Sequence, residues 1–177
     1  MTNRTVFTGA ATAIITPLTP DGIDFERYGA LIDWQIAQGI DAIVAVGTTG
    51  EGSTLSDEEH RAAIKYCVER VNGRVPVIAG TGSNDTAYSV DLSRYAASVG
   101  ADAMLLVTPY YNKATQKGLV KFFTDIADAS TVPPSSSAWS AWQAVCPSSP
   151  APAPTTPPTR WIFPATPPPW VLTPCCW

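Results

Sequence analysis

Residues 41–56 read DAIVAVGTTGEGSTLS, and this stretch decides the fold class. After Asp41 the run is continuously apolar, as is typical of a parallel strand that is covered on both faces. The glycines that follow allow a sharp turn with exposed N–H groups, and Ser56 then opens a helix. A strand that ends in such a turn is where an α/β protein often holds a small anion. Spacing alone leaves a plain βα loop with a glycine-rich cap equally open.

The helix after this stretch has the strongest start and stop signals in the chain. Ser56 and Glu59 have the spacing of a capping box, and acidic residues in the first turn suit the helix dipole. Asn72 and Gly73 end the helical pattern. The predicted inner stripe consists of Ala62, Ala63, Tyr66, Cys67 and Val71.

Strands and helices alternate along the chain on both sides of this unit. We expect strands over 7–16, 41–46, 75–80 and 103–108, and helices over 25–38, 56–71, 84–98 and 115–129. The first strand is expected to be short and buried, and Asn84 to cap the third helix. Four βα units of about thirty residues predict a parallel sheet with right-handed crossovers, in a doubly wound fold or a barrel. The first and fourth strands are expected to be open edges. The chain has no GxGxxG or Walker A pattern, so nothing supports a nucleotide site.

Composition narrows the classes of partner. The 177 residues carry a net charge of −4, which argues against nucleic acid and anionic membranes as partners. The four cysteines show no zinc-ligand spacing and no disulfide framework, and no metal or cofactor is expected. No segment is long and apolar enough to cross a membrane, and we expect a cytoplasmic location.

The chain divides by composition into residues 1–130 and a second region, 131–177. The second region contains 13 of the 17 prolines, and its one charged side chain is Arg160. Proline at this density predicts disorder or polyproline II structure. The abrupt change in composition suggests a frameshifted reading of a longer gene. A non-catalytic alternative is an interaction protein that uses the PxxP spacings at 147–150 and 154–157.

Four motifs carry a family resemblance. FTGAATAIITP (7–17), VGTTGE (46–51), IAGTG (78–82) and VTPYYN (107–112) occur in this order and spacing. As a set they resemble the N-terminal half of the dihydrodipicolinate synthase family, which belongs to the pyruvate-dependent Schiff-base aldolases and lyases. The resemblance covers about residues 6 to 130. It implies an incomplete (β/α)8 TIM barrel of about four βα units, followed by the irregular proline-rich tail.

The resemblance implies a lyase that condenses pyruvate with aspartate semialdehyde on the lysine and diaminopimelate route. Thr49 would bind the pyruvate carboxylate, helped by N–H groups of its loop. Thr48 and Tyr111 would form part of a proton relay, with Tyr111 reaching a neighbouring subunit of a homo-oligomer, a tetramer in the family. Hydroxyl groups in series can pass a proton between water and a bound enamine. The other interpretations are a turn hydroxyl for Thr48 and a packing contact for Tyr111.

One further expectation follows from the resemblance. Some members have a regulatory lysine site, and the matching positions here are Gly52, Ser53, His60, Asn84 and Tyr110, while Asp57 and Tyr88 depart from that pattern. Taken alone, His60 is predicted to be an ordinary helix-surface residue.

The Schiff-base lysine of the family lies beyond the resembling part. The lysines of the chain are Lys65, Lys113, Lys117 and Lys121, expected on helices or at a helix start and in solvent. The chain is therefore expected to be inactive by itself. Alternatives within the family are N-acetylneuraminate lyase and sugar-acid aldolases. A generic phosphate-binding domain that uses residues 80–84 is a further alternative.

Overall fold

The computed structural model describes residues 6–130, so the predictions for residues 131–177 fall outside the described part of the chain. In chain order the elements are β1 (Ala11–Ala13), β2 (Leu18–Thr19), β3 (Gly22–Ile23), α1 (Phe25–Ala37), β4 (Ala42–Ala45), α2 (Asp57–Val71), β5 (Val77–Gly80), α3 (Thr86–Ser98), β6 (Ala103–Leu105) and α4 (Gln116–Ala129).

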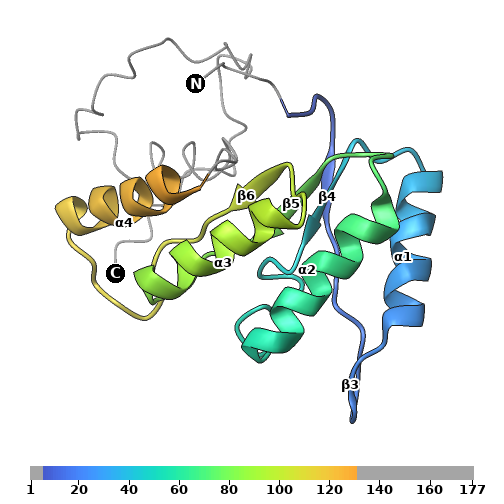
Figure 1. Cartoon of the computed structure of the whole chain (residues 1–177), viewed down its shortest axis with the longest axis horizontal. Coiled ribbons are helices and arrows are strands. Elements are labelled where there is room, and N and C mark those ends of the chain that lie inside the picture. Colours follow the sequence, from blue (N-terminus) through green and yellow to red (C-terminus); the bar gives the residue numbers. More distant parts are fainter. Residues whose placement is uncertain (1–5, 131–177) are drawn as a thin grey trace, which may run out of the picture. The chain divides into compact units, whose positions relative to one another are not determined.

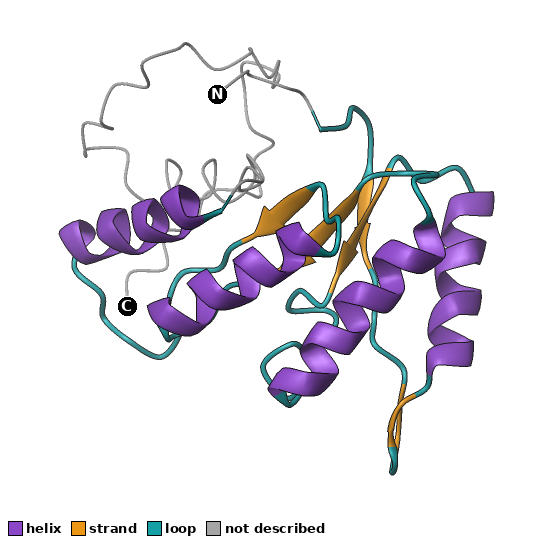
Figure 2. Cartoon of the chain, viewed as in Figure 1, coloured by secondary structure: helices purple, strands orange, loops and turns teal. Residues whose placement is uncertain are grey.

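Four strands form one parallel sheet in the order β1-β4-β5-β6. Helices α1, α2 and α3 lie side by side across one face of this sheet, and α4 packs against α3 (Figure 1). This arrangement confirms the predicted parallel βα units and the two predicted edge strands. The strands β2 and β3 form a separate antiparallel pair on either side of Pro20 and Asp21 (Figure 2). This pair was not predicted, because two-residue strands leave no periodic pattern in the sequence.

The first strand is shorter and more exposed than predicted. It spans Ala11–Ala13, where Ala11 and Ala13 are exposed and Thr12 is half-buried. Ala11 pairs with Ala42 and Ala13 with Val44, so these alanines lie on the sheet face away from the helices. The prediction of a buried strand over 7–16 was therefore wrong, because an edge strand has a neighbour on one side only.

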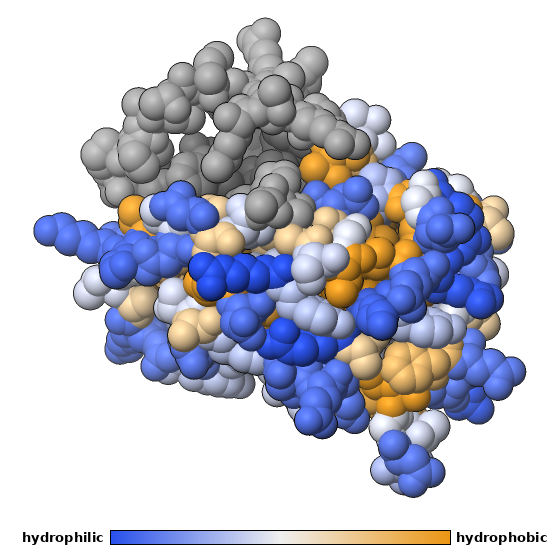
Figure 3. All heavy atoms as spheres, viewed as in Figure 1, coloured by the Kyte–Doolittle hydropathy of each residue, from blue (hydrophilic) through white to orange (hydrophobic). Residues whose placement is uncertain are grey.

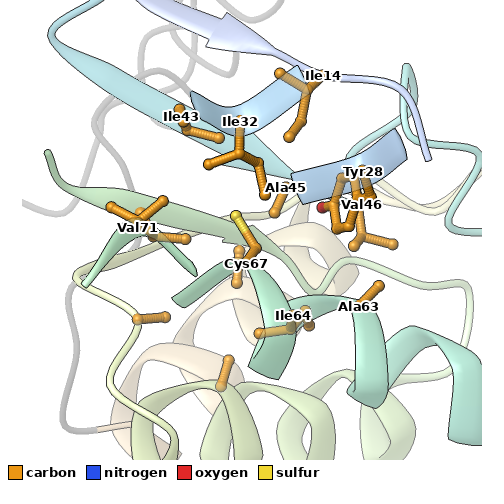
Figure 4. Packing of buried hydrophobic residues seen from close by; sticks show 14 of the residues in the cluster. Ile14, Tyr28, Ile32, Ile43, Ala45, Val46, Ala63, Ile64, Cys67 and Val71 are labelled. Atoms are coloured by element: carbon orange, nitrogen blue, oxygen red, sulfur yellow. The ribbon is translucent and has the colours of Figure 1, made fainter. Parts of the chain in front are cut away.

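The main core lies between the helices and one face of the sheet (Figure 4). Its largest fully buried side chains include Tyr28, Ile32, Ile43 and Ile64. On the opposite face, Ala42, Val44, Ile78 and Ala103 form a second cluster against which Phe7 packs. All residues of β4 and β5 are buried, and for β4 this confirms the prediction of a strand covered on both faces.

The ends of α2 follow the predicted signals. Ser56 Oγ accepts a bond from Glu59 N, and the Glu59 carboxylate accepts one from Ser56 N at 2.9 Å, which completes the capping box. Asn72 has the left-handed conformation, with φ of 47°, that commonly ends a helix. The inner stripe needs one correction, because Ala62 is exposed and Ile64 is buried in its place. On the face shown in Figure 3, hydrophilic side chains cover most of the helices.

The start of α3 differs from the prediction. Its N-cap is Asp85, whose side chain accepts a bond from Ala87 N at 2.9 Å. Asn84 is therefore not the cap. Its carboxamide Oδ1 instead accepts a bond from Tyr110 N at 2.6 Å. Sequence spacing could not separate two adjacent residues that both favour the N-cap position.

Candidate functional site

The predicted site residues lie on loops at one edge of the sheet. The loop 46–56 follows β4, residues 81–85 follow β5, and residues 106–115 follow β6. Because these strands are parallel, their carboxyl ends meet at the same edge. Thr48 and Thr49 belong to the first loop, Asn84 to the second, and Tyr110 and Tyr111 to the third. This edge is where open α/β sheets and barrels bind ligands.

The loop after β4 is folded into successive turns, and we call residues 46–54 the threonine loop. Glu51 N donates to Thr48 O at 3.1 Å, Gly52 N to Gly47 O at 3.4 Å, and Thr54 N to Glu51 O at 2.9 Å. Val46 and Glu51 both have positive φ, 53° and 55°. A β-branched residue such as valine rarely adopts this conformation, so its surroundings must impose it.

Two glycines explain how the chain passes so close to Val46. A Cβ at Gly80 would collide with the carbonyl oxygen of Val46, and one at Gly52 would lie 2.7 Å from the same oxygen. No other residue type fits at either position without moving the backbone. The carbonyl of Val46 is thus enclosed by the threonine loop on one side and by the end of β5 on the other.

The two threonines present their side chains at the surface of this loop. Both are exposed, and within residues 6–130 no hydrogen bond engages their hydroxyl groups. The alternative interpretation of Thr48, a turn hydroxyl bonded to its own backbone, has no such bond in the described part of the chain. The backbone N–H groups of Thr48, Thr49 and Gly50 make no backbone hydrogen bond there either. The loop therefore offers hydroxyl and N–H donors to a ligand.

The tyrosine pair follows β6. Tyr111 is fully exposed, with φ of 59°, and Tyr110 is 36% exposed. Their rings meet edge to face, with centroids 6.1 Å apart. The bond from Tyr110 N to Asn84 ties this segment to the loop after β5. Asn84 and Tyr110, two of the residues matched to a regulatory site, are therefore in contact.

His60 is buried, so its interpretation as a helix-surface residue was wrong. It is 5% exposed, and its Nε2 lies 2.8 Å from the Gly80 carbonyl oxygen. Burial lowers the pKa of His60, although the backbone of Gly80 and Gly52 and the charge of Asp57 act in the opposite direction. The sequence did contain a signal, because His60 lies three and four residues before the buried Ala63 and Ile64.

Neighbours of His60 on α2 are engaged in ion pairs. Arg61 Nε donates to the two Asp57 oxygens at 3.0 and 2.9 Å, and Arg61 also pairs with Asp91. The bond from Arg61, with a smaller contribution from Tyr88, lowers the pKa of Asp57. Ser53 is exposed on the threonine loop. Asp57, one of the two departures from the regulatory pattern, is thus paired with Arg61, and Tyr88, the other departure, contributes to the lowered pKa of Asp57.

The four lysines are exposed, as predicted. Lys65, Lys117 and Lys121 lie on α2 and α4, and Lys113 lies in the loop before α4. Lys65 pairs with Glu69, and Lys121 with Asp125. Among residues 6–130 no cluster of three or more histidine, cysteine, aspartate or glutamate side chains could hold a metal ion. No helix in the same range has the length and hydropathy needed to cross a bilayer.

Comparison with known proteins identifies close relatives. The family model described as the dihydrodipicolinate synthetase family matches residues 6–134. A 4-hydroxy-tetrahydrodipicolinate synthase from Acetivibrio thermocellus is 61% identical over 130 residues, which are 73% of this chain and 44% of the relative. The chain thus spans less than half the length of that curated relative.

Solved structures agree with the sequence matches. The chloride-inhibited dihydrodipicolinate synthase of Acinetobacter baumannii, complexed with pyruvate, superposes with a TM-score of 0.70 at 50% identity, covering 73% of this chain and 44% of the other. YagE, a prophage protein of the dihydrodipicolinic acid synthase family from E. coli K12, also in complex with pyruvate, superposes with a TM-score of 0.71 at 36% identity, with the same coverage.

Proposed function

The chain belongs to the dihydrodipicolinate synthetase family, and we propose that residues 6–130 are the first half of a (β/α)8 barrel that acts as a 4-hydroxy-tetrahydrodipicolinate synthase. Such an enzyme condenses pyruvate with aspartate semialdehyde through a lysine Schiff base. The support is the parallel sheet of four βα units, two edge strands open to further pairing, and 61% identity to a synthase of that name.

The threonine loop is the observation that carries this proposal. It carries the exposed hydroxyls of Thr48 and Thr49, whose N–H groups make no backbone hydrogen bond within residues 6–130, at the carboxyl edge of a parallel sheet, where they would receive a small carboxylate. In this proposal Thr49 and the N–H groups bind the pyruvate carboxylate. Two solved relatives were crystallised with pyruvate, which fits this ligand.

Thr48 and Tyr111 are proposed to pass protons between solvent and the bound enamine. A relay needs hydroxyls that are not already committed to the protein, and the Thr48 hydroxyl has no partner within residues 6–130. Tyr111 is turned fully outward. It would therefore act at the site of a neighbouring subunit in a homo-oligomer rather than beside the Thr48 of its own chain.

Imine formation requires a lysine that is desolvated so that its amine is neutral and nucleophilic. The four lysines of this chain are exposed. We propose that none is the nucleophile and that the chain is inactive alone. A complete enzyme would carry the lysine on a later strand of the barrel.

Other expectations remain proposals. Another pyruvate-dependent aldolase or lyase of the family is the alternative activity, and the similarity to YagE at 36% identity is its support. The regulatory lysine site would use Ser53, Asn84 and Tyr110, while His60 already bonds to Gly80 through Nε2. The cytoplasm is the proposed location.

Pyruvate binding tests the threonine loop. In the ¹⁵N-labelled full chain, pyruvate should shift the amide signals of Thr48, Thr49 and Gly50. Thr49→Val should abolish the shifts because it replaces the hydroxyl by a methyl group, and the matched control Thr49→Ser should retain them. Unchanged pyruvate binding in Thr49→Val would contradict the proposed role of Thr49.

Borohydride trapping tests the missing nucleophile. Pyruvate and sodium borohydride should leave the intact mass of the full chain unchanged, because no imine forms for the reagent to reduce. The curated synthase from Acetivibrio thermocellus is the control that should gain an adduct. A stable adduct on this chain would show that one of its own lysines is reactive.

A further inference from the structure

The threonine loop is held from two sides by buried polar side chains that lie away from its exposed hydroxyls. We propose that Thr16 and His60 are positioning residues, which hold the backbone that presents Thr48 and Thr49 at the edge of the sheet. This inference rests on the proposed pyruvate site for its functional meaning. Its structural part concerns the loop alone and can be tested separately.

Thr16 holds the loop from the side of β1. It lies three residues beyond the end of that strand and is 3% exposed, whereas the preceding Ile15 is 54% exposed. Its Oγ1 donates to the Gly50 carbonyl oxygen at 2.8 Å. Gly50 directly follows the two threonines in the chain. A buried hydroxyl bond to this carbonyl therefore limits where the middle of the loop can lie.

His60 holds the other side through β5. Its Nε2 faces the Gly80 carbonyl oxygen, which can only accept, so Nε2 carries the proton of the neutral ring. The lowered pKa of His60 agrees with a neutral ring. Gly80 in turn packs against the carbonyl of Val46, where the threonine loop begins. The histidine thereby fixes the end of β5 against the first residue of the loop.

The conformation of Val46 indicates that this support is needed. Its positive φ of 53° is unfavourable for a β-branched side chain, and it persists only where neighbouring groups leave no alternative. Val46 is itself 2% exposed. The strained residue thus lies at the base of the loop, between the points that Thr16 and His60 hold. Strain of this kind is concentrated at functional sites.

Neither residue is proposed to touch a ligand. Thr16 and His60 are buried and each bonds to a backbone carbonyl, so they would act only through the threonine loop. A residue that merely stabilises the whole domain would change the exchange of all amides alike. A positioning residue should instead change the threonine loop selectively.

Hydrogen exchange measures this selectivity. The amides of Glu51, Gly52 and Thr54 are bonded within the loop and report its opening. In the full chain, Thr16→Val should speed their exchange about tenfold, because it replaces the buried hydroxyl by a methyl group of similar volume. Thr16→Ser keeps the donor and should restore slow exchange. Amides within α3 serve as the internal reference and should not change.

A second pair of variants tests the other side. His60→Leu removes the donor to Gly80 and should speed exchange of the same three amides, whereas His60→Gln keeps an N–H at a similar reach and should restore protection in part. If the leucine variant does not fold, the Thr16 pair decides alone. Unchanged loop exchange in Thr16→Val, or an equal change in α3, would overturn the proposal.

Pyruvate titration separates this inference from the proposed function. Weaker pyruvate binding in Thr16→Val, recovered in Thr16→Ser, supports both. If the wild-type chain binds no pyruvate but the loop amides still respond selectively, the positioning role stands and the pyruvate site fails. If pyruvate binds to Thr16→Val as to the wild type and loop exchange is unchanged, the positioning role fails and the site stands.

Discussion

The threonine loop and residues 108–113 after β6, which we call the tyrosine segment, leave the same edge of the sheet. They differ in how many contacts with the rest of the chain hold them in place. The threonine loop is bonded to Thr16 through the Gly50 carbonyl, and its first residue, Val46, packs against Gly80, to which His60 bonds. Within the described part of the chain, residues 108–113 make a single hydrogen bond, from Tyr110 N to Asn84. Tyr111 is fully exposed. The difference indicates that the first region is held in place by its own chain, whereas the second is held at one point only.

The largest expected effect comes from a substitution that disturbs the packing of the threonine loop. Gly80→Ala adds a Cβ that collides with the carbonyl of Val46, and should lower the free energy of unfolding by about 3 kcal/mol. Urea denaturation of the full chain measures it. Gly39→Ala is the matched control, because Gly39 has a φ of 84° but open space around it, and should cost only about 1 kcal/mol. Equal losses would refute the close packing at Gly80.

The next effect is a dependence of the folding stability on pH, caused by His60. Its pKa is lowered in the folded chain by burial, so below pH 6.5 the unfolded chain binds more protons than the folded chain. Stability should be complete above pH 6.5 and fall as the pH is lowered, by at most about 1.4 kcal/mol per pH unit for one proton. The attraction of Asp57 and the repulsion of Arg61 partly offset each other.

Urea denaturation between pH 7 and pH 5 measures this contribution. His60→Gln is the control, because glutamine does not titrate and should flatten the curve. A wild-type slope that persists in this variant would assign the pH dependence to other groups.

A smaller effect distinguishes the two residues before α3. Asp85→Ala should lose about 1 kcal/mol, because it removes the helix N-cap. Asn84→Ala should leave the helix intact and loosen Tyr110, with faster exchange of the Tyr110 amide by about tenfold or less. Nuclear magnetic resonance of both variants measures the two effects. A loss of helical signals in Asn84→Ala would restore Asn84 as the cap.

The smallest expected effect on stability comes from a substitution in the tyrosine segment. Tyr111→Ala should change the free energy of unfolding by less than about 0.5 kcal/mol, because the side chain is fully exposed. Denaturation measures stability, and analytical ultracentrifugation of the same samples measures association. A large loss of stability within the monomer would mean that Tyr111 already packs against its own chain.

Much of the fold followed from local signals. These signals are the apolar runs of β4 and β5, the capping box of α2 and the end of α2 at Asn72. Each depends on residues that are neighbours in the sequence, so it could be recognised without the structure. The errors arose at β1, Ala62, Asn84 and His60. At each of these, packing or pairing with a distant segment decides the outcome.

The sequence by itself determined the order of the βα units, the parallel sheet and the family motifs, because hydrophobic period and turn residues act over a few positions. Tertiary structure alone decided that Ala11 and Ala13 of β1 are exposed and that the ring of His60 bonds to the carbonyl of Gly80. It also decided that Val46 adopts a strained conformation, because the carbonyl of Val46 is fitted against Gly52 and Gly80, which lie 6 and 34 positions away in the sequence. Such contacts exist only once strands β4 and β5 lie side by side.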